Sequence, residues 1–529
     1  MPVFQIFWKI IAHLRRASSL PLREARHRLP PITSKTDTTM TAFDPDSIRP
    51  ALAANFIGGE AVVGRGRSFE VLRPSDGQLL GELRAADEQQ LCAAVENAAM
   101  AQKASGWGAM EPRGRMKLLR RWADLIEADA ETLVPLEAVG SSRTLAEVRA
   151  WDLPYTAECI RFFAEFADKH GGEIAATTPD KLGFTLTEPY GVIGAIAPWN
   201  LPLVMAAWKL GPALAAGNAV VLKPSELTPF SVVRLAELAV AAGIPAGVFN
   251  VVQGGGGDIG DALVRHERIA KVSFTGSTRT GQAIMAACAM TGPKPSTLEL
   301  GGKSPQIVFA DADLAKASAL VARAITLNSG QVCVAGSRLL VHEKARDEVV
   351  ERLTTAFEAH RLGTTWDAAT TMGPIISEGQ LATIDGIVQR ARAAGAEAVT
   401  GGARAVSPQS GSYYQPTLLA GMSDDNEAVQ GEIFGPVLTV QSFADEDEAF
   451  ALANGTRYGL AAGVHTTDIS RALRAVRALE AGTVWVNRYG RSDDFILPTG
   501  GFKQSGVGKD LGREAYLGSC KVKTALIQI

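Results

Sequence analysis

Short apolar runs alternate with helical stretches through the middle of the chain, and this alternation limits the possible folds more than any other feature. The runs cover residues 192–197, 219–222, 248–252 and 272–274. Stretches with helical periodicity, such as residues 230–242, separate them. Strands that are apolar throughout belong to parallel sheets buried between helices. The sequence therefore predicts an α/β fold with a buried parallel sheet.

A second alternating set follows Glu299. Residues 305–309 and 338–342 have the pattern of strands, and residues 314–327 and 345–360 have the pattern of helices. With 529 residues, the chain exceeds the size at which a single hydrophobic core stops growing. We therefore expect a second α/β unit that begins near Glu299.

Three other segments have a clear periodicity. Residues 112–133 repeat apolar side chains at helical spacing, which predicts one long amphipathic helix. Residues 181–188 and 520–529 alternate apolar and polar side chains, as strands exposed on one face do. These two strands are expected to pair either with each other or with the edge of a partner subunit.

Composition and charge exclude several classes of function. A formal net charge of -3 and the absence of zinc-finger spacing argue against nucleic-acid binding. The apolar region 191–222 is interrupted by three prolines, Asn200 and Lys209, so it does not predict a membrane span. The seven histidines include no His-Glu-x-x-His sequence, and we predict no catalytic metal.

The five cysteines, at positions 92, 159, 288, 333 and 520, include no Cys-x-x-Cys pair. This distribution favours a reducing compartment, and we expect a cytoplasmic protein. The first 35 residues are basic and contain a single acid, Glu24. They form a transit peptide, a loosely attached basic arm, or an upstream extension with the functional start at Met40. We favour the last and expect residues 1–40 to be disordered.

Cys333 is a candidate nucleophile. It lies between a predicted helix and a predicted strand, in a segment flanked by Gly330 and Gly336. A lone cysteine is usually a small buried hydrophobic residue. The two glycines favour the other interpretation, because they allow an irregular backbone that brings a thiol to a cleft.

Two polar residues have patterns that suit the same chemistry. Asn200 lies between Pro198 and Pro202 after a predicted strand, where it either caps a turn or donates its amide to an oxyanion. Glu299 lies between two leucines and precedes two glycines. A partly buried carboxylate of this kind has a raised pKa, which suits a general base, although a buried salt bridge is the alternative.

Two strand ends have features of a dinucleotide site. Gly276, Ser277 and Thr278 follow an apolar strand and open a helix, where free amides and the helix dipole bind a pyrophosphate. Another strand ends in Lys-Pro-Ser-Glu at residues 223–226, and Lys223 and Glu226 suit hydrogen bonds to ribose hydroxyls. An acid there repels a 2'-phosphate, so NAD is predicted rather than NADP.

Six motifs occur in an order that resembles the aldehyde dehydrogenase superfamily from about Phe56 to the C-terminus. They are Pro-Trp-Asn at 198–200, Lys-Pro-Ser-Glu at 223–226, Phe-Thr-Gly-Ser at 274–277, Glu-Leu-Gly-Gly-Lys at 299–303, Gly-Gln-Val-Cys at 330–333 and Glu-Ile-Phe-Gly-Pro at 432–436. Each motif alone is weak evidence. Together and in this order they do not plausibly match by chance.

The resemblance implies a subunit of three parts that forms a homodimer or homotetramer. These are a Rossmann-like NAD-binding domain (residues 41–170 and 190–298), an α/β catalytic domain (299–505) and a small bridging β element for oligomerisation (171–189 and 506–529). It also implies that Trp199, Lys223, Ser225, Glu226, Gly276, Ser277, Thr278, Glu432 and Phe434 bind NAD. Glu432 would contact the ribose on the nicotinamide side, and Phe434 would pack beside the nicotinamide.

The implied reaction is the oxidation of an aldehyde to a carboxylic acid through a thioester on Cys333. Asn200 and the Cys333 amide would stabilise the oxyanion, and Glu299 would act as the general base for hydrolysis. Two alternatives stay open: a relative that transfers the acyl group to coenzyme A, and a catalytically silent NAD-binding protein. The carboxylate at Glu299 favours hydrolysis, and the intact Cys333, Asn200 and Glu299 argue against a silent protein.

The chain departs from the family pattern around the substrate funnel. Thr499 occupies a position where many relatives carry an aromatic residue, which predicts a wider or more polar funnel. The preceding loop, residues 487–495, contains Arg488, Arg491, Asp493 and Asp494. These charges either bind a charged substrate group or pair with one another, and we favour pairing. In the family, Met205 and Trp208 would line the aldehyde tunnel.

Overall fold

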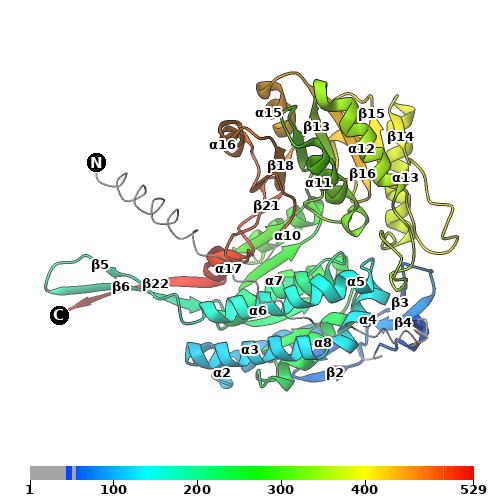
Figure 1. The fold of residues 1–529 in the computed structure, drawn as a ribbon. Coiled ribbons are helices and arrows are strands. Elements are labelled where there is room, and N and C mark those ends of the chain that lie inside the picture. The colour runs from blue at the N-terminus through cyan, green and yellow to red at the C-terminus, as the bar shows by residue number, and fades with distance from the viewer. Residues whose placement is uncertain (1–42, 51–54, 492–493) are drawn as a thin grey trace, which may run out of the picture. The chain divides into compact units, whose positions relative to one another are not determined.

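A computed structural model describes residues 43–50, 55–491 and 494–529. Between Asp44 and Ile529 the chain forms two large sheets and a small antiparallel sheet. Figure 1 shows the two large sheets with their covering helices. The predicted α/β fold class is confirmed, because each large sheet has a run of adjacent parallel strands. The predicted N-terminal extension, residues 1–40, lies outside the described residues.

The first large sheet has eight strands. In spatial order they are β2 (Glu60–Val62), β1 (Asn55–Ile57), β9 (Phe249–Val251), β8 (Ala219–Lys223), β7 (Val192–Ile196), β10 (Lys271–Thr275), β11 (Ser296–Glu299) and β21 (Gly506–Val507). The five strands from β9 to β11 are parallel, and β1, β2 and β21 add antiparallel edges. Their side chains are almost entirely buried, as the apolar runs predicted.

Helices cover both faces of this sheet. Alternate β8 residues, Ala219 and Val221, pack in a core with α2 (Glu88–Ala104), α9 (Asp261–Arg265) and α10 (Thr278–Met290). Side chains alternate across a strand, so the intervening residues of β8 point to the opposite face. There, α7 (Pro202–Ala215) and α8 (Phe230–Ala241) pack on the strands.

A further helix layer lies outside α7 and α8, as Figure 1 shows. It contains α3 (Pro112–Ala128), α4 (Ala130–Gly140) and α6 (Leu153–Phe166). The prediction of one helix over residues 112–133 is wrong, because the helix is interrupted at Asp129. Both carboxylate oxygens of Asp129 accept hydrogen bonds from Arg234, each at 2.8 Å, and this long-range pair fixes the break.

The second large sheet has seven strands. In spatial order they are β14 (Glu397–Thr400), β15 (Thr417–Ala420), β16 (Val437–Phe443), β13 (Arg338–His342), β12 (Pro305–Val308), β18 (Ala461–His465) and β19 (Thr483–Val486). All pairs are parallel except β14 with β15. The helices that pack on this sheet are α11 (Leu314–Thr326), α12 (Arg346–Glu358), α13 (Glu378–Ala393), α14 (Glu427–Gln430), α15 (Glu446–Asn454) and α16 (Ile469–Ala478).

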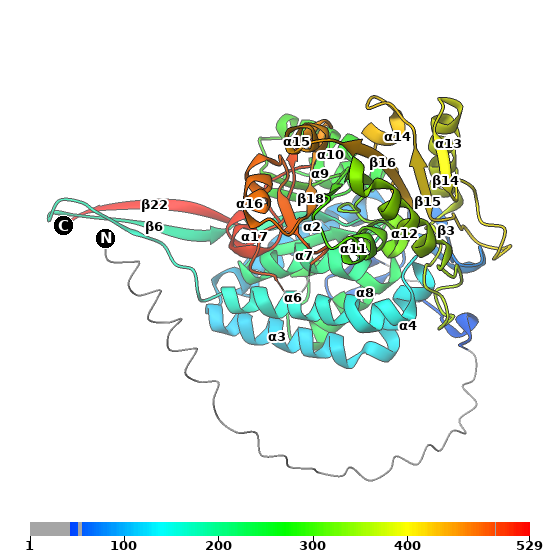
Figure 2. The ribbon, with the colours of Figure 1, turned by 45° about the horizontal axis from the view of Figure 1, so that its top comes forward.

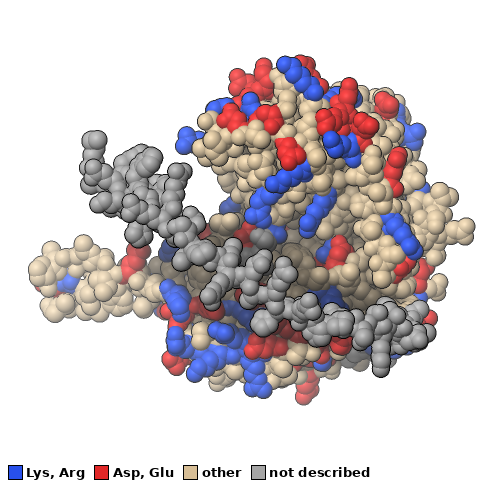
Figure 3. Space-filling view, viewed as in Figure 1, with Lys and Arg blue, Asp and Glu red and all other residues tan. Residues whose placement is uncertain are grey.

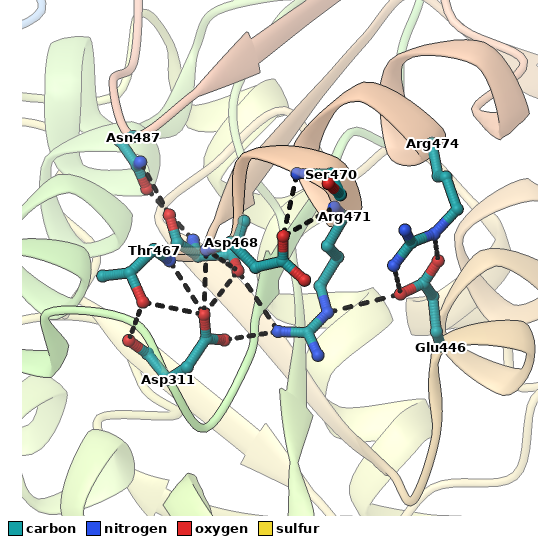
Figure 4. Close-up of polar contacts among 9 residues, drawn as sticks. Asp311, Glu446, Thr467, Asp468, Ser470, Arg471, Arg474 and Asn487 are labelled. Carbon is teal, nitrogen blue, oxygen red and sulfur yellow. Dashed lines mark hydrogen bonds and ion pairs between the residues drawn. The ribbon is translucent and has the colours of Figure 1, made fainter.

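A polar network lies at the carboxyl ends of β12 and β18, two neighbouring strands inside this sheet (Figure 4). The carboxylate of Asp311 accepts hydrogen bonds from the Thr466 hydroxyl at 2.7 Å and from the Thr467 amide at 2.9 Å. Burial alone would raise the pKa of Asp311, but these hydrogen bonds and the Arg471 guanidinium lower it to about 2. Glu446 joins the network through Arg471 and Arg474. The network has no residue in the cavity described below and serves the fold.

The small sheet contains β5 (Ile174–Ala175), β6 (Lys181–Pro189) and β22 (Cys520–Gln528). Strands β6 and β22 pair antiparallel along their whole length, from Cys520 opposite Pro189 to Gln528 opposite Lys181. The sequence predicted that these two strands pair either with each other or with a partner subunit, and in the structure they pair with each other. This sheet projects from the two larger ones in Figures 1 and 2.

The remaining short elements connect these layers. They are the pair β3 (Ser68–Leu72) and β4 (Leu79–Arg84), the pair β17 (Tyr458–Gly459) and β20 (Phe502–Lys503), α5 (Leu145–Glu147) and α17 (Gly512–Gly518). Basic and acidic side chains are interspersed on the face shown in Figure 3. Within the described residues, none of the helices has the length and apolar character needed to cross a bilayer.

Candidate active site

A cavity of about 800 Å³ is lined by residues that follow strands of both large sheets. In the eight-stranded sheet, the chain runs from β7 outward through β8 to β9 and then returns to the other side of β7 as β10. The carboxyl ends of strands at such a reversal form the usual crevice for ligands in α/β sheets. Trp199 follows β7 and Gly276 follows β10, and both line the cavity.

Most of the residues predicted from the sequence meet in this cavity. Those that line it are Trp199, Asn200, Gly276, Ser277, Glu299, Cys333, Glu432 and Phe434. Met205 and Trp208 line it as well, as the resemblance implied. Lys223, Ser225, Glu226 and Thr278 do not line it, although they lie at the ends of β8 and β10.

Shortly before Cys333, three consecutive residues have a left-handed backbone conformation. Asn328, Ser329 and Gly330 have φ values of 49°, 55° and 73°. At Gly330 a Cβ atom would lie 2.1 Å from the carbonyl oxygen of Gly435, so only glycine fits there. This turn ends α11 and places the thiol, which is partly exposed, in the cavity wall. The flanking-glycine pattern had indicated such an irregular backbone.

The surroundings of the Cys333 thiol raise its pKa and so favour the protonated form. Burial raises the pKa of the thiol to about 12, and the carboxylates of Glu299 and Glu432 add to the effect. The backbone N–H groups of Val334 and Cys333 lie close to the sulfur and act in the opposite direction. A thiol in this setting gives up its proton only to a nearby base or as it reacts.

Asn200 is held against the backbone of the Cys333 segment. Its side-chain amide donates a hydrogen bond to the carbonyl of Gln331 at 3.0 Å, and the Asn328 amide donates to the Asn200 carbonyl at 2.9 Å. The Asn200 side chain has a second N–H, and the residue is buried at the cavity wall. The side-chain amide of Asn200 is thus held on the backbone of Gln331, two residues before Cys333.

Glu299 ends β11 and is 5% exposed. Burial and, to a smaller extent, the charge of Asp510 raise the pKa of its carboxyl to about 8, against the effect of Lys209 and Lys509. Its Oε1 atom has no hydrogen-bond partner among the described residues. A buried carboxyl with an unpartnered oxygen and a pKa close to the working pH suits proton transfer.

Glu432 and Phe434 form another part of the wall. Oε1 of Glu432 accepts a hydrogen bond from the Gly302 amide at 3.0 Å, and burial raises the pKa of this carboxyl to about 7. Phe434 has a φ of 55° and meets the indole of Trp199 edge-on, with ring centroids 5.2 Å apart. The two rings are nearly perpendicular and give this part of the cavity wall an apolar surface.

The ends of β8 and β10 fit the polar parts of a dinucleotide. The Ser277 hydroxyl accepts a hydrogen bond from the Thr280 amide at 3.3 Å and caps α10, whose N-terminus adjoins the cavity. At β8, Lys223 lies 3.4 Å from Glu226 and is almost fully buried. Burial lowers the pKa of Lys223, against the effect of Glu226. The donor set therefore matches a pyrophosphate and ribose hydroxyls.

Several residues that shape the site were not predicted. Asn328 and Gln331 hold Asn200 in place, and Tyr155 and Tyr489 line the cavity. The aromatic residues give no local signal, because an amphipathic helix such as α6 uses the same residues for its core. Asn328 could have been suspected from the Asn-Ser-Gly sequence, since asparagine and glycine tolerate left-handed backbone.

Comparisons with known proteins agree with this geometry. The model of the aldehyde dehydrogenase family matches residues 62–525. A curated aldehyde dehydrogenase from Emericella nidulans is 43% identical over 472 residues, which cover 89% of this chain and 94% of the relative. The family model spans the strands of both large sheets except β1 and most of β2.

Solved structures are similar over most of the chain. The indole-3-acetaldehyde dehydrogenase AldA of P. syringae, a mutant in complex with NAD⁺ and IAA, has a TM-score of 0.89 and 40% identity. The gamma-glutamyl-gamma-aminobutyraldehyde dehydrogenase of Burkholderia cenocepacia has a TM-score of 0.89 and 42% identity. Each alignment covers 92% of this chain and 98% of the other. The expected fold is confirmed, and the chain belongs to the aldehyde dehydrogenase family.

Proposed function

We propose that the protein oxidises an aldehyde to a carboxylic acid with NAD⁺, through a thioester on Cys333. The observation that carries the proposal is the meeting of Cys333, Asn200 and Glu299 in one cavity whose opposite wall fits a dinucleotide. The net reaction consumes one aldehyde, one NAD⁺ and one water, and yields the acid, NADH and a proton. The NAD⁺ complex of AldA supports the choice of cofactor.

The reaction begins with the thiol. Because the pKa of Cys333 is about 12, its proton has to leave as the sulfur attacks the aldehyde carbon. The proton passes to solvent, so Glu299, whose carboxyl has a pKa of about 8, stays available for the later attack of water. The attack forms the carbon–sulfur bond and moves the carbonyl π electrons to the aldehyde oxygen.

Asn200 and the Cys333 backbone amide receive the resulting negative charge. The Asn200 amide keeps one N–H on the Gln331 carbonyl and has the other for the oxyanion. Donors that are fixed before the reaction stabilise the transition state without reorganisation, and this effect is often the largest in acyl transfer. The rigid turn around residues 328–331 therefore serves catalysis through the position of the donor.

NAD⁺, when bound, supplies a hydride acceptor and a positive charge. Trp199 and Phe434 fit the nicotinamide side, with Glu432 at its ribose, and Gly276, Ser277 and Thr278 fit the pyrophosphate. Lys223, Ser225 and Glu226 fit the other ribose. In the hydrolysis of the thioester, Glu299 would take a proton from water as the water attacks the thioester carbon. The carbon–sulfur bond would break, and Cys333 would leave as a thiolate that recovers a proton from solvent.

The test is a panel of aldehydes assayed for NADH with NAD⁺, with and without coenzyme A. Hydrolysis predicts a carboxylic acid as the product and no dependence on coenzyme A. A thioester of coenzyme A as the main product would support the acylating alternative instead. Failure to form NADH with every aldehyde of the panel would leave a silent NAD-binding protein as the better description.

Replacing Glu226 with glutamine is expected to reduce the preference for NAD⁺ over NADP⁺ by about tenfold, because a carboxylate near the adenosine ribose repels a 2'-phosphate. The measurement is kcat/KM for each cofactor with one aldehyde. The control is Glu165→Gln, which removes a more exposed acid (59% against 36% for Glu226) from α6, outside the cavity. An unchanged cofactor ratio in Glu226→Gln would remove Glu226 from the ribose site.

The predicted division into domains, a homodimer or homotetramer and a cytoplasmic location also belong to this proposal. The eight-stranded sheet supports an NAD-binding domain and the seven-stranded sheet a catalytic domain. Exposed apolar residues on β6 and β22, such as Leu186, Val522 and Leu526, support an oligomerisation element. Within the proposed range 506–529, β21 and α17 pack with the eight-stranded sheet and its helices. The five free cysteines fit a reducing compartment.

A further inference from the structure

We propose that the substrate is an aldehyde with a carboxylate at its far end, and that Arg491 binds this carboxylate. The inference rests on the proposed function and adds a substrate class to it. Arg491 lines the same cavity as Cys333, and it comes from the loop after β19. The sequence alone had favoured pairing among the charges of this loop.

The side chain of Arg491 is largely buried, but its guanidinium makes only long contacts with the protein. Its side chain is only 12% exposed, and the carboxylate of Asp494 lies 3.9 Å away. Its hydrogen bonds go to two backbone carbonyls, those of Leu497 at 3.3 Å and Pro498 at 3.4 Å. A guanidinium has five N–H groups arranged as a fork that matches a carboxylate. The described contacts therefore leave this cation with donors for a ligand.

Two further donors on the same wall have no hydrogen-bond partner among the described residues. They are the hydroxyl of Tyr155, a residue that is 3% exposed, and the indole N–H of Trp208. Burial raises the pKa of Tyr155, whereas the charge of Arg491 and the Trp208 N–H act against this effect. The Trp208 N–H is therefore directed at the Tyr155 oxygen, outside full hydrogen-bond geometry, and the Tyr155 O–H is the donor left for a ligand beside Arg491. A buried donor without an acceptor is unfavourable unless a ligand supplies one.

Apart from Asp494, which lies 3.9 Å from Arg491, the acids near this wall are committed to protein partners. Glu147 lies 3.0 Å from Arg143 and accepts hydrogen bonds from the amide and hydroxyl of Thr144. Asp152 holds the same arginine through both oxygens, each at 2.8 Å. Arg323, an exposed residue at the cavity, adds another positive charge. The titratable groups of this wall thus favour an anionic ligand over a cationic one.

Apolar side chains also line the cavity, among them Met205, Leu327 and Val332. A substrate that fits the whole cavity therefore has an aldehyde near Cys333, an apolar spacer and an acceptor group near Arg491. A carboxylate supplies the acceptor sites and the charge that Arg491 and Tyr155 together require. Thr499, in place of an aromatic residue, leaves room in the funnel for such an extended molecule.

The experiment compares matched aldehydes in the full-length enzyme. Succinic semialdehyde and longer ω-carboxy aldehydes are each paired with the unsubstituted aldehyde of the same chain length, and kcat and KM are measured with NAD⁺. We expect a lower KM for at least one carboxylated member, with a kcat/KM about tenfold or more above its neutral partner. Arg491→Met should remove most of this ratio through KM and leave the neutral aldehydes nearly unaffected.

Two variants separate the role of Arg491 from general electrostatics. Arg488→Met removes the same charge from the same loop, but Arg488 is exposed and does not line the cavity. It should keep the preference. Arg491→Lys keeps the charge without the fork and should recover only part of the ratio. Equal losses in Arg488→Met and Arg491→Met would overturn the assignment to Arg491.

The remaining outcomes distinguish this inference from the proposed function. If the wild-type enzyme oxidises neutral aldehydes equally well, or prefers amino-aldehydes, the carboxylate inference is wrong while the proposed function stands. If no aldehyde of any kind yields NADH, the proposed function itself fails. A preference that weakens as salt is added agrees with a charge interaction, and a preference indifferent to salt contradicts it.

Discussion

Cys333→Ala should reduce NADH formation by about four orders of magnitude or more, because no other group in the cavity can form the covalent intermediate. The measurement is the absorbance of NADH with the best aldehyde of the panel, over long incubations at high enzyme concentration. The variant should still bind NAD⁺, which quenching of tryptophan fluorescence can report because Trp199 lies in the cavity wall. Retained binding separates a lost nucleophile from a lost fold.

The matched control is Cys92→Ala. Cys92 is an exposed thiol on α2 and has no part in the cavity, so its removal should leave activity unchanged. Residual activity of Cys333→Ala close to that of the wild type would exclude the thioester mechanism. The same conclusion would follow if Cys92→Ala and Cys333→Ala lost activity to a similar extent.

Glu299→Gln should form NADH in an initial burst and then slow by about a hundredfold or more, because the amide cannot take a proton from water. The burst should approach one NADH per active site, because the thiol proton passes to solvent in the first step and does not need Glu299. Rapid-mixing absorbance measures burst and steady state separately, and mass spectrometry of the quenched enzyme should detect the acyl group on Cys333. A steady-state rate equal to that of the wild type would contradict the role of Glu299 as base.

The pH dependence of the wild type follows from the same carboxyl. Burial raises its pKa to about 8, so the group is mostly protonated below this pH and cannot act as a base. Where hydrolysis limits the rate, kcat should rise with pH and level off above about 8. Glu299→Gln should lack this rise. Glu432→Gln serves as a control, because its carboxyl is buried in the same cavity but should affect KM for NAD⁺ and retain the rise.

The fold was largely predictable because its strands are buried on both faces. Continuous apolar runs between helical stretches marked β7, β8, β9 and β10, and their bounds agree within one or two residues. The short hairpin of β1 and β2 escaped prediction, since strands of three residues have too little periodicity to recognise. The break at Asp129 also escaped, because it depends on Arg234, a residue 105 positions away.

The site was predictable to the extent that its residues sit in motifs. Cys333, Asn200 and Glu299 were found in this way, and their convergence in one cavity agrees with the expectation. Tyr155 could not be found, because its importance comes from which cavity it faces. For Arg491 the sequence left two interpretations open and favoured pairing with a neighbouring acid; the structure has such a pair with Asp494, at 3.9 Å, and also places Arg491 at the cavity.

The left-handed turn at residues 328–330 has a consequence for the rate of each catalytic cycle. A flexible loop would have to lose conformational freedom whenever the sulfur lined up with a carbonyl carbon, and this loss would add to the activation barrier. Here the bend is set during folding and locked by a glycine that no other residue can replace. The entropy of alignment is therefore lost once in the lifetime of the molecule, and not again at every turnover.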